Sequence, residues 1–382
     1  MYIQFLKELI GFQSVTPHSA GSIEYIATVL EQHGFKSEIK IFGDGDEKVT
    51  NLYAVYGNSK PNICFAGHVD VVPVGDRSLW LHDPFTAVTD NEKIYGRGTV
   101  DMKGAIACFL AASLDFLKQN PTPNGSISFL ITSDEEGPAK YGTNEMLKYL
   151  HNNNNDSLID LAIVGEPTNE NQIGDTIKIG RRGSINFDLL LRGLAGHVAY
   201  PMKAKNPIPS MMQILHELAN YQLDEGNQFF QPSNLELTSV DVDNDVTNVI
   251  PGKIRGRFNV RFNSLHSAAT IRDIVEQVVE QYCTKYGIEY ELTSRSSADS
   301  FIQEPVGLIA DFLQVVQNTT KVDTKLSTSG GTSDARFIKN YCPVVEFGLK
   351  SDEAHKINEY TQIIDLQSLY RVYYNSLIKF LS

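Results

Sequence analysis

Cysteine is scarce in this chain, and the four present do not form a recognisable framework. Cys64, Cys108, Cys283 and Cys342 are scattered and show no CxxC spacing. Their pattern therefore indicates neither a set of disulfides nor a thiolate zinc site. Free cysteines fit a reducing compartment, so we expect a cytoplasmic protein.

Positive charge and long hydrophobic runs are also lacking. The chain carries 33 basic against 46 acidic residues, a formal net charge of -13, which argues against a nucleic-acid or anionic-membrane partner. The longest apolar stretch, residues 105–114, is interrupted by Ser113 and is too short to span a bilayer. Residues 1–12 predict an amphipathic helix without the features of a signal peptide. Cations remain plausible ligands, and we expect neither export nor membrane insertion.

A strand and helix rhythm occupies the first half of the chain. Apolar strands are predicted at residues 63–66, 127–132 and 161–164, and polar residues follow them. The intervals from His68 to Asp101, then to Glu135, then to Glu166 are 33, 34 and 31 residues. A βαβ unit has about this length, roughly 30 residues. We therefore expect these side chains at one edge of a mixed, largely parallel sheet flanked by helices, where ligands bind in α/β folds.

A chain of 382 residues is longer than a single hydrophobic core usually accommodates, and its middle part has a different hydrophobic pattern. Residues 253–262 alternate apolar and polar side chains, which is typical of a strand with one solvated face. We expect residues 184–296 to form an inserted α+β domain. Residues 1–183 and 297–382 would form the first domain.

The polar groups expected near the strand ends form one set of possible metal ligands: His68, Asp70, Asp101, Glu135, Glu136, Glu166 and His355. Imidazoles and carboxylates without thiolates suit Zn²⁺, Co²⁺ or Mn²⁺. Taken singly, each has an ordinary interpretation, such as a helix N-cap for Asp101 or a solvated turn for Glu135 and Glu136. Their joint placement favours a metal site.

A series of motifs resembles the M20 family of metal-dependent amidohydrolases. In chain order they are AGHVDVVPVGD, IYGRGTVDMKG, ITSDEEGP, VGEPT, GRRGS, GHVAYP, TNVIPG, SGGTSDARFI and AHKINEY. The matches run from about residue 60 to residue 360. Within the family they are most similar to the enzymes that hydrolyse N-succinyl-LL-2,6-diaminopimelate to succinate and LL-2,6-diaminopimelate.

The resemblance implies a zinc-exopeptidase-like catalytic domain with two zinc ions, for which cobalt or manganese can substitute. His68 and Glu166 would hold one ion, Glu136 and His355 the other, and Asp101 would bridge both. Asp70 would orient His68, and Glu135 would act as general base on metal-activated water. The peptide bond after Asp101 would be cis.

The resemblance also implies that the inserted domain is a lid and the dimer interface. His197 would stabilise the oxyanion in the partner's active site, with Asn248 nearby. Substrate carboxylates would be bound by Arg181, Arg182 and Arg261, by the turn at Gly331 and Thr332, and near Ser351.

The segment before His355 departs from the desuccinylase pattern. Residues 350–354 read KSDEA. Ala354 followed by His355, with Glu359 and Tyr360 beyond, is closer to the acetylornithine deacetylases of the family. An acetylornithine deacetylase, another aminoacylase or a peptidase thus remains an alternative. A metal-free binding protein that retained the fold is the alternative from another class.

Overall fold

The computed structural model describes residues 1–153 and 159–382, which form two compact units. Unit 1 comprises Met1–Ile179, Gln303–Ser327 and Ser333–Ser382. Unit 2 comprises Gly180–Ile302 and Thr328–Thr332. The chain leaves unit 1, forms most of unit 2 and then returns, and residues 184–296 all lie in unit 2.

Unit 1 is built around a sheet of eight strands. In spatial order these are β1 (Lys36–Phe42), β2 (Val49–Tyr56), β6 (Ser126–Thr132), β3 (Asn62–His68), β7 (Leu161–Val164), β18 (Val344–Glu346), β8 (Thr176–Lys178) and β17 (Lys325–Ser327). The four central strands β6, β3, β7 and β18 are parallel neighbours. β1 and β2 are antiparallel at one edge, and β8 is antiparallel to β18. The predicted mixed, largely parallel sheet is confirmed.

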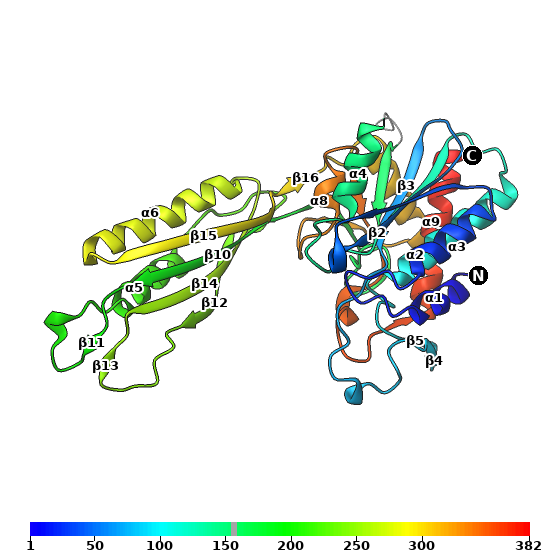
Figure 1. Cartoon of the computed structure of the whole chain (residues 1–382). Coiled ribbons are helices and arrows are strands. Elements are labelled where there is room, and N and C mark those ends of the chain that lie inside the picture. Colours follow the sequence, from blue (N-terminus) through cyan, green and yellow to red (C-terminus); the bar gives the residue numbers. More distant parts are fainter. Residues whose placement is uncertain (154–158) are drawn as a thin grey trace. The chain divides into compact units, whose positions relative to one another are not determined.

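Helices cover this sheet on both sides (Figure 1). They are α1 (Tyr2–Gly11), α2 (Ser22–Glu31), α3 (Lys103–Gln119), α4 (Thr143–Asn152), α7 (Leu308–Thr320), α8 (Ala335–Ile338) and α9 (Ile363–Leu381). All residues of β3 and β6 are buried, as expected for strands with both faces covered. Phe65 and Phe129 of these strands contact Phe109 of α3, and the ring centroids of Phe65 and Phe109 are 4.8 Å apart. This packing fixes the strands whose ends carry the polar residues.

Unit 2 contains an antiparallel sheet of four strands. In spatial order these are β12 (Asn234–Asp241), β14 (Lys253–Phe262), β10 (Gly183–Arg192) and β15 (Glu289–Ala298). α5 (Ile208–Asn220) and α6 (Ala268–Tyr286) pack together and against the sheet. Alternate residues of β14 are buried in this core, where Phe187 and Phe258 stack with centroids 5.0 Å apart. One sheet face therefore stays polar, as the alternation predicted.

Short elements complete the two units. Unit 1 has a small sheet of β19 (Tyr360–Gln362), β5 (Lys93–Tyr95) and β4 (Val88–Asp90), and 3₁₀ turns η1 (Gly45–Glu47), η2 (Arg77–Leu79) and η4 (Ser351–Glu353). Unit 2 has the pairs β9 (Gly180–Arg181) with β16 (Phe301–Ile302) and β11 (Gly196–His197) with β13 (Val249–Ile250), and η3 (Pro201–Lys203). Within the described ranges, no helix is both long and apolar enough to cross a membrane.

Candidate metal centre

Three neighbouring parallel strands deliver polar side chains to one edge of the main sheet. His68 is the last residue of β3, Glu135 and Glu136 follow β6, and Glu166 follows β7. β3 pairs in parallel with both β6 and β7. Because the carboxyl ends of parallel neighbours lie at the same edge, these residues meet there.

Asp101 reaches the same place by another route. The residue spacing predicted that Asp101 reaches the same sheet edge, and a loop before a helix, not a strand of the main sheet, brings it there. Asp101 lies between β5, which belongs to the small three-stranded sheet, and the start of α3. The bond between Asp101 and Met102 is cis, as the resemblance implied. His355 comes from the loop between η4 and β19.

Asp101 lies between the two imidazoles. Its Oδ1 is 3.2 Å from Nε2 of His68, and its Oδ2 is 3.2 Å from Nε2 of His355. Oε1 of Glu136 is 2.7 Å from the same nitrogen of His355. Oε1 of Glu166 is 3.6 Å from Nε2 of His68. The chain thus forms two adjacent donor sets that share one carboxylate.

Asp70 organises the histidine and both glutamates. Nδ1 of His68 lies 2.9 Å from the backbone oxygen of Asp70 and 3.5 Å from its carboxylate. The Asp70 carboxylate, which is fully buried, also accepts hydrogen bonds from the backbone N–H groups of Glu135 at 3.2 Å and Glu136 at 3.1 Å. One side chain therefore fixes three of the residues around the site.

The protonation of these groups reflects their mutual contacts. Burial lowers the pKa of His68, but hydrogen bonds to its acidic neighbours outweigh burial and raise this pKa well above its usual value. Hydrogen bonds to Asp101 and a glutamate raise the pKa of His355 to about 10. Burial opposes ionisation of Asp101, yet hydrogen bonds from the imidazoles lower its pKa. Burial raises the pKa of Glu135 and Glu166 well above the usual glutamate value. Without metal, the protonated imidazole of His355 supplies positive charge here at neutral pH.

The donor atoms fit divalent cations. Donor atoms of His68, Glu135 and Glu166 lie within 4.8 Å of one another, and so do those of His68, Asp101 and Glu136. Oε1 of Glu166 is buried and has no hydrogen-bond partner in the described part of the chain. Separations of 3.2 and 3.6 Å resemble the roughly 3.4 Å between ligands of a tetrahedral zinc with ~2.1 Å bonds. A buried carboxylate oxygen that has no hydrogen-bond partner and lies next to nitrogen and oxygen donors is typical of a cation site.

Two further candidates lie together in unit 2. His197 of β11 and Asn248 are both exposed, and the backbone oxygen of Asn248 accepts a hydrogen bond from Val198 at 3.1 Å. Nδ1 of His197 accepts a hydrogen bond from the backbone of Ala199 at 3.0 Å. This bond leaves Nε2 of His197 as the nitrogen that can donate to a ligand.

The arginine candidates also belong to unit 2. Nη1 of Arg182 donates to Asn234 at 2.8 Å, whereas its Nε is buried without a partner among the described residues. Burial, and then the nearby charge of Arg261, lower the pKa of Arg182. Arg181 is buried and donates to the backbone oxygen of Ser329 at 3.2 Å. Two guanidinium groups near each other favour an anionic ligand.

The remaining candidates lie in loops. Gly331 and Thr332 end the turn Thr328–Thr332, which belongs to unit 2. Ser351 starts η4 of unit 1, and its backbone N–H and hydroxyl both bond the oxygen of Asn169, at 2.9 and 3.4 Å.

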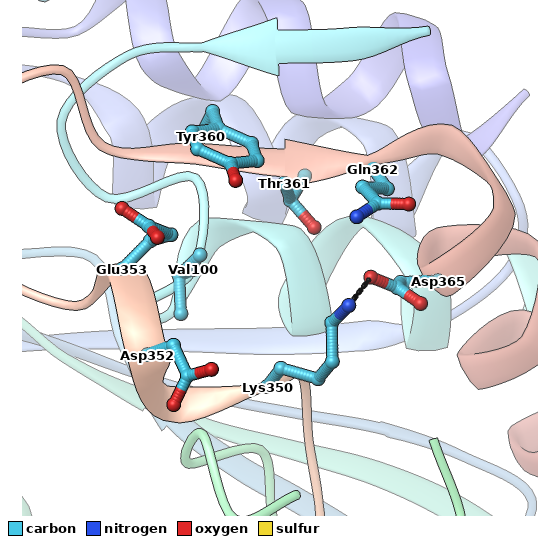
Figure 2. A pocket seen from close by; sticks show the side chains of 8 residues that line it. All are labelled: Val100, Lys350, Asp352, Glu353, Tyr360, Thr361, Gln362 and Asp365. Atoms are coloured by element: carbon cyan, nitrogen blue, oxygen red, sulfur yellow. Dashed lines mark ion pairs between the residues drawn. The ribbon is translucent and has the colours of Figure 1, made fainter. Parts of the chain in front are cut away.

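The cavity in Figure 2 is lined by Asp352 and Glu353 of η4, where the sequence departs from the desuccinylase pattern. Its volume is about 60 Å³. Lys350 and Asp365 also line this cavity and form an ion pair at 2.8 Å.

Two further residues lie beside the centre, and no sequence pattern predicted their position. Asp334 and Arg336 are both buried and paired at 3.9 Å. Both residues affect the pKa of Glu135, on which burial and then His68 have the largest effects. Asp334 raises this pKa, and Arg336 lowers it. Nε of Arg336 has no hydrogen-bond partner within the described ranges. Both residues belong to SGGTSDARFI, a motif that predicted family membership but not their position near Glu135.

Comparison with known proteins identifies the family. Residues 64–379 match peptidase family M20/M25/M40. The chain belongs to the M20 family. Proteins named succinyl-diaminopimelate desuccinylase from Rickettsia bellii and Rickettsia akari are each 63% identical to it. These alignments cover all of this chain and 97% and 100% of the respective relatives.

Solved structures of other M20 proteins share the fold. An M20 metallo-carboxypeptidase from Sulfolobus solfataricus matches with a TM-score of 0.78 at 17% identity, covering 98% of each chain. The aminopeptidase PepT from Bacillus cereus has a TM-score of 0.78 at 16% identity, covering 99% of this chain and 97% of its own. At such identities the likeness concerns the M20 fold alone.

Proposed function

We propose that this chain hydrolyses N-succinyl-LL-2,6-diaminopimelate to succinate and LL-2,6-diaminopimelate. The observation that carries the proposal is 63% identity, over the whole chain, to proteins named succinyl-diaminopimelate desuccinylase. The centre at the sheet edge adds the residues that an amide hydrolase needs. The reaction would serve lysine and peptidoglycan-precursor synthesis in the cytoplasm.

The donor sets suit two zinc ions per subunit, with cobalt or manganese as substitutes. His68 and Glu166 would hold one ion, His355 and Glu136 the other, and Asp101 would contribute one oxygen to each. Bound divalent cations would polarise the amide carbonyl and lower the pKa of water at the site.

Glu135 would perform the proton transfers. Its backbone is fixed by Asp70, and its carboxyl group lies near His68 and Glu166 without belonging to the proposed ligands. Glu135 would take a proton from the attacking water as the new C–O bond forms. It would then give this proton to the amine nitrogen as the C–N bond breaks. Burial, which raises the pKa of Glu135, favours such proton exchange.

The substrate carries several carboxylates, and the chain offers guanidinium groups for them. Arg182 and Arg261 are neighbours, and the charge of Arg261 adds to burial in lowering the pKa of Arg182. Arg181 and the turn at Gly331 and Thr332 would complete these contacts. Bidentate arginine bonds to a carboxylate would distinguish a succinyl from an acetyl group.

Unit 2 would be the lid and the dimer interface. Apolar side chains are exposed around His197, including Tyr200 at 62% and Met202 at 95% of their surface. Val246 is likewise 52% exposed. Apolar groups this exposed are typical of a surface that another subunit covers. From the partner, His197 would donate a hydrogen bond to the developing oxyanion, with Asn248 beside it.

Acetylornithine deacetylase is the second candidate, because Ala354 followed by His355, with Glu359 and Tyr360 beyond, resembles that branch of the family. A substrate panel separates the two activities. Purified protein with added Zn²⁺ would be assayed with N-succinyl-LL-2,6-diaminopimelate, N-acetylornithine, other N-acyl amino acids and dipeptides. We expect the largest kcat/KM for the succinylated substrate. A preference for N-acetylornithine would overturn the substrate assignment.

A further inference from the structure

Glu359 makes an unusual set of contacts beneath the metal centre. Its side chain is fully buried, and Oε1 accepts hydrogen bonds from the backbone N–H groups of Val100 at 2.9 Å and Asp101 at 3.3 Å. Oε2 accepts a hydrogen bond from Nη1 of Arg97 at 2.8 Å. The carboxylate therefore bonds the peptide group of the very residue that lies between the two imidazoles.

Arg97 extends this arrangement to the loop of the second imidazole. Its Nη1 also donates to the backbone oxygen of Lys356 at 3.1 Å. The backbone N–H of Gly96 donates to the oxygen of Glu359 at 2.9 Å. The guanidinium carbon lies 5.1 Å from the ring centroid of Trp80, so packing also restrains the arginine.

The two imidazoles are consequently held in different ways. His68 is oriented by Asp70, which also fixes the backbone of Glu136. His355 is half exposed, and the residue that follows it is fixed by Arg97. The Glu359–Arg97 ion pair thus links the backbone of Asp101 to the backbone next to His355.

We propose that Glu359, together with Arg97, is a positioning residue that keeps Asp101 and His355 at the separation required by the cation they share. The inference rests on the proposed function, because it assumes that cations occupy both donor sets. It goes further in assigning to His355, a ligand of the second cation alone, a support that His68 does not use. A buried ion pair that only stabilises the fold would leave metal affinity unchanged.

Glu359→Gln tests this inference. The amide keeps the size of the side chain, but its NH₂ group must face either Arg97 or the backbone N–H groups, and both are donors. Chelator competition with Co²⁺, followed by the visible absorption of the bound metal, would measure both affinities. We expect the variant to retain one tight ion and to bind the second about 10- to 100-fold more weakly, as when an outer contact of a ligand is lost.

Two further variants make the result specific. Arg97→Lys keeps the charge but lacks the planar guanidinium that donates from Nη1 to both Glu359 and the backbone of Lys356, so it should weaken the same ion to a smaller extent. Asp224→Asn is the matched control, because Asp224 in unit 2 is a buried carboxylate that also accepts backbone hydrogen bonds, from Gly226 and Ser233. That unit holds none of the proposed metal ligands, so this control should keep both ions.

The outcomes are distinct. A folded Glu359→Gln variant that binds both ions like the wild type would overturn the positioning role. An equal loss of metal in Asp224→Asn would also overturn it, because the loss would then reflect general destabilisation. Wild-type protein that binds no divalent metal would overturn the proposed function itself.

Discussion

Replacing Glu135 by glutamine removes the proposed proton carrier and leaves its surroundings in place. The hydrogen bonds from Glu135 and Glu136 to Asp70 come from backbone N–H groups, so the substitution retains them. None of the five proposed ligands changes. We therefore expect normal folding and normal metal content.

The size of the effect follows from the number of proton transfers. General acid–base catalysis contributes about 10²- to 10⁴-fold to a step. Because Glu135 would act in both C–O formation and C–N cleavage, we expect kcat to fall at least ~10³-fold. At about 1.36 kcal/mol for each tenfold change, this is roughly 4 kcal/mol of transition-state stabilisation. KM should change little.

The assay is release of the free amine from N-succinyl-LL-2,6-diaminopimelate by zinc-loaded protein. Glu145→Gln is the control, because Glu145 belongs to α4 and pairs with Lys148 on the surface. It should have wild-type kcat. A Glu135→Gln variant with nearly normal kcat would refute the assignment of the base.

Three other predictions concern the dimer, the pH dependence and the core. His197→Ala should lower kcat by about 10²- to 10³-fold. If His197 acts in the partner's site, mixing this variant with the Glu135→Gln variant should restore roughly a quarter of wild-type activity, because mixed dimers contain one intact site. No recovery of activity would contradict that role. Since the pKa of His355 is raised to about 10 without metal, cation binding at neutral pH should release a proton, and affinity should increase as pH rises toward 10. Titration calorimetry in buffers of different ionisation enthalpy would detect this release, and its absence would contradict the raised pKa. Phe258→Ala should destabilise unit 2 by about 3–5 kcal/mol, as measured by denaturant unfolding, whereas a loss below ~1 kcal/mol would contradict the packing described.

The raised pKa of His355 also determines how the stability of the metal-free protein depends on pH. Its folded pKa lies above the usual value of 6.5, so its contribution to the stability of the metal-free protein is complete below pH 6.5. That contribution is lost as the pH rises through about 10.

Local pattern was sufficient to predict the strands that build the site. β3, β6 and β7 are continuous apolar segments, and each is followed by the polar residues that meet at the sheet edge. β14 was predicted with its observed bounds, because alternation is strong over its whole length. β8 and β17 were missed, since three residues are too few to show a period.

Contacts between distant segments could not be predicted in this way. The spacing placed Asp101 at the edge of the main sheet but did not show that a loop from a separate small sheet supplies it. Glu359 lies 258 residues from Asp101 in the chain, and no periodicity links the two. The same holds for Arg336, whose place near Glu135 depends on tertiary packing.

X-ray diffraction from zinc-loaded crystals at the zinc absorption edge tests whether Asp101 lies between two cations. We expect two anomalous peaks, one contacting His68 and Glu166 and one contacting His355 and Glu136, with Asp101 between them. Peaks at other residues, or none at this edge of the sheet, would contradict it.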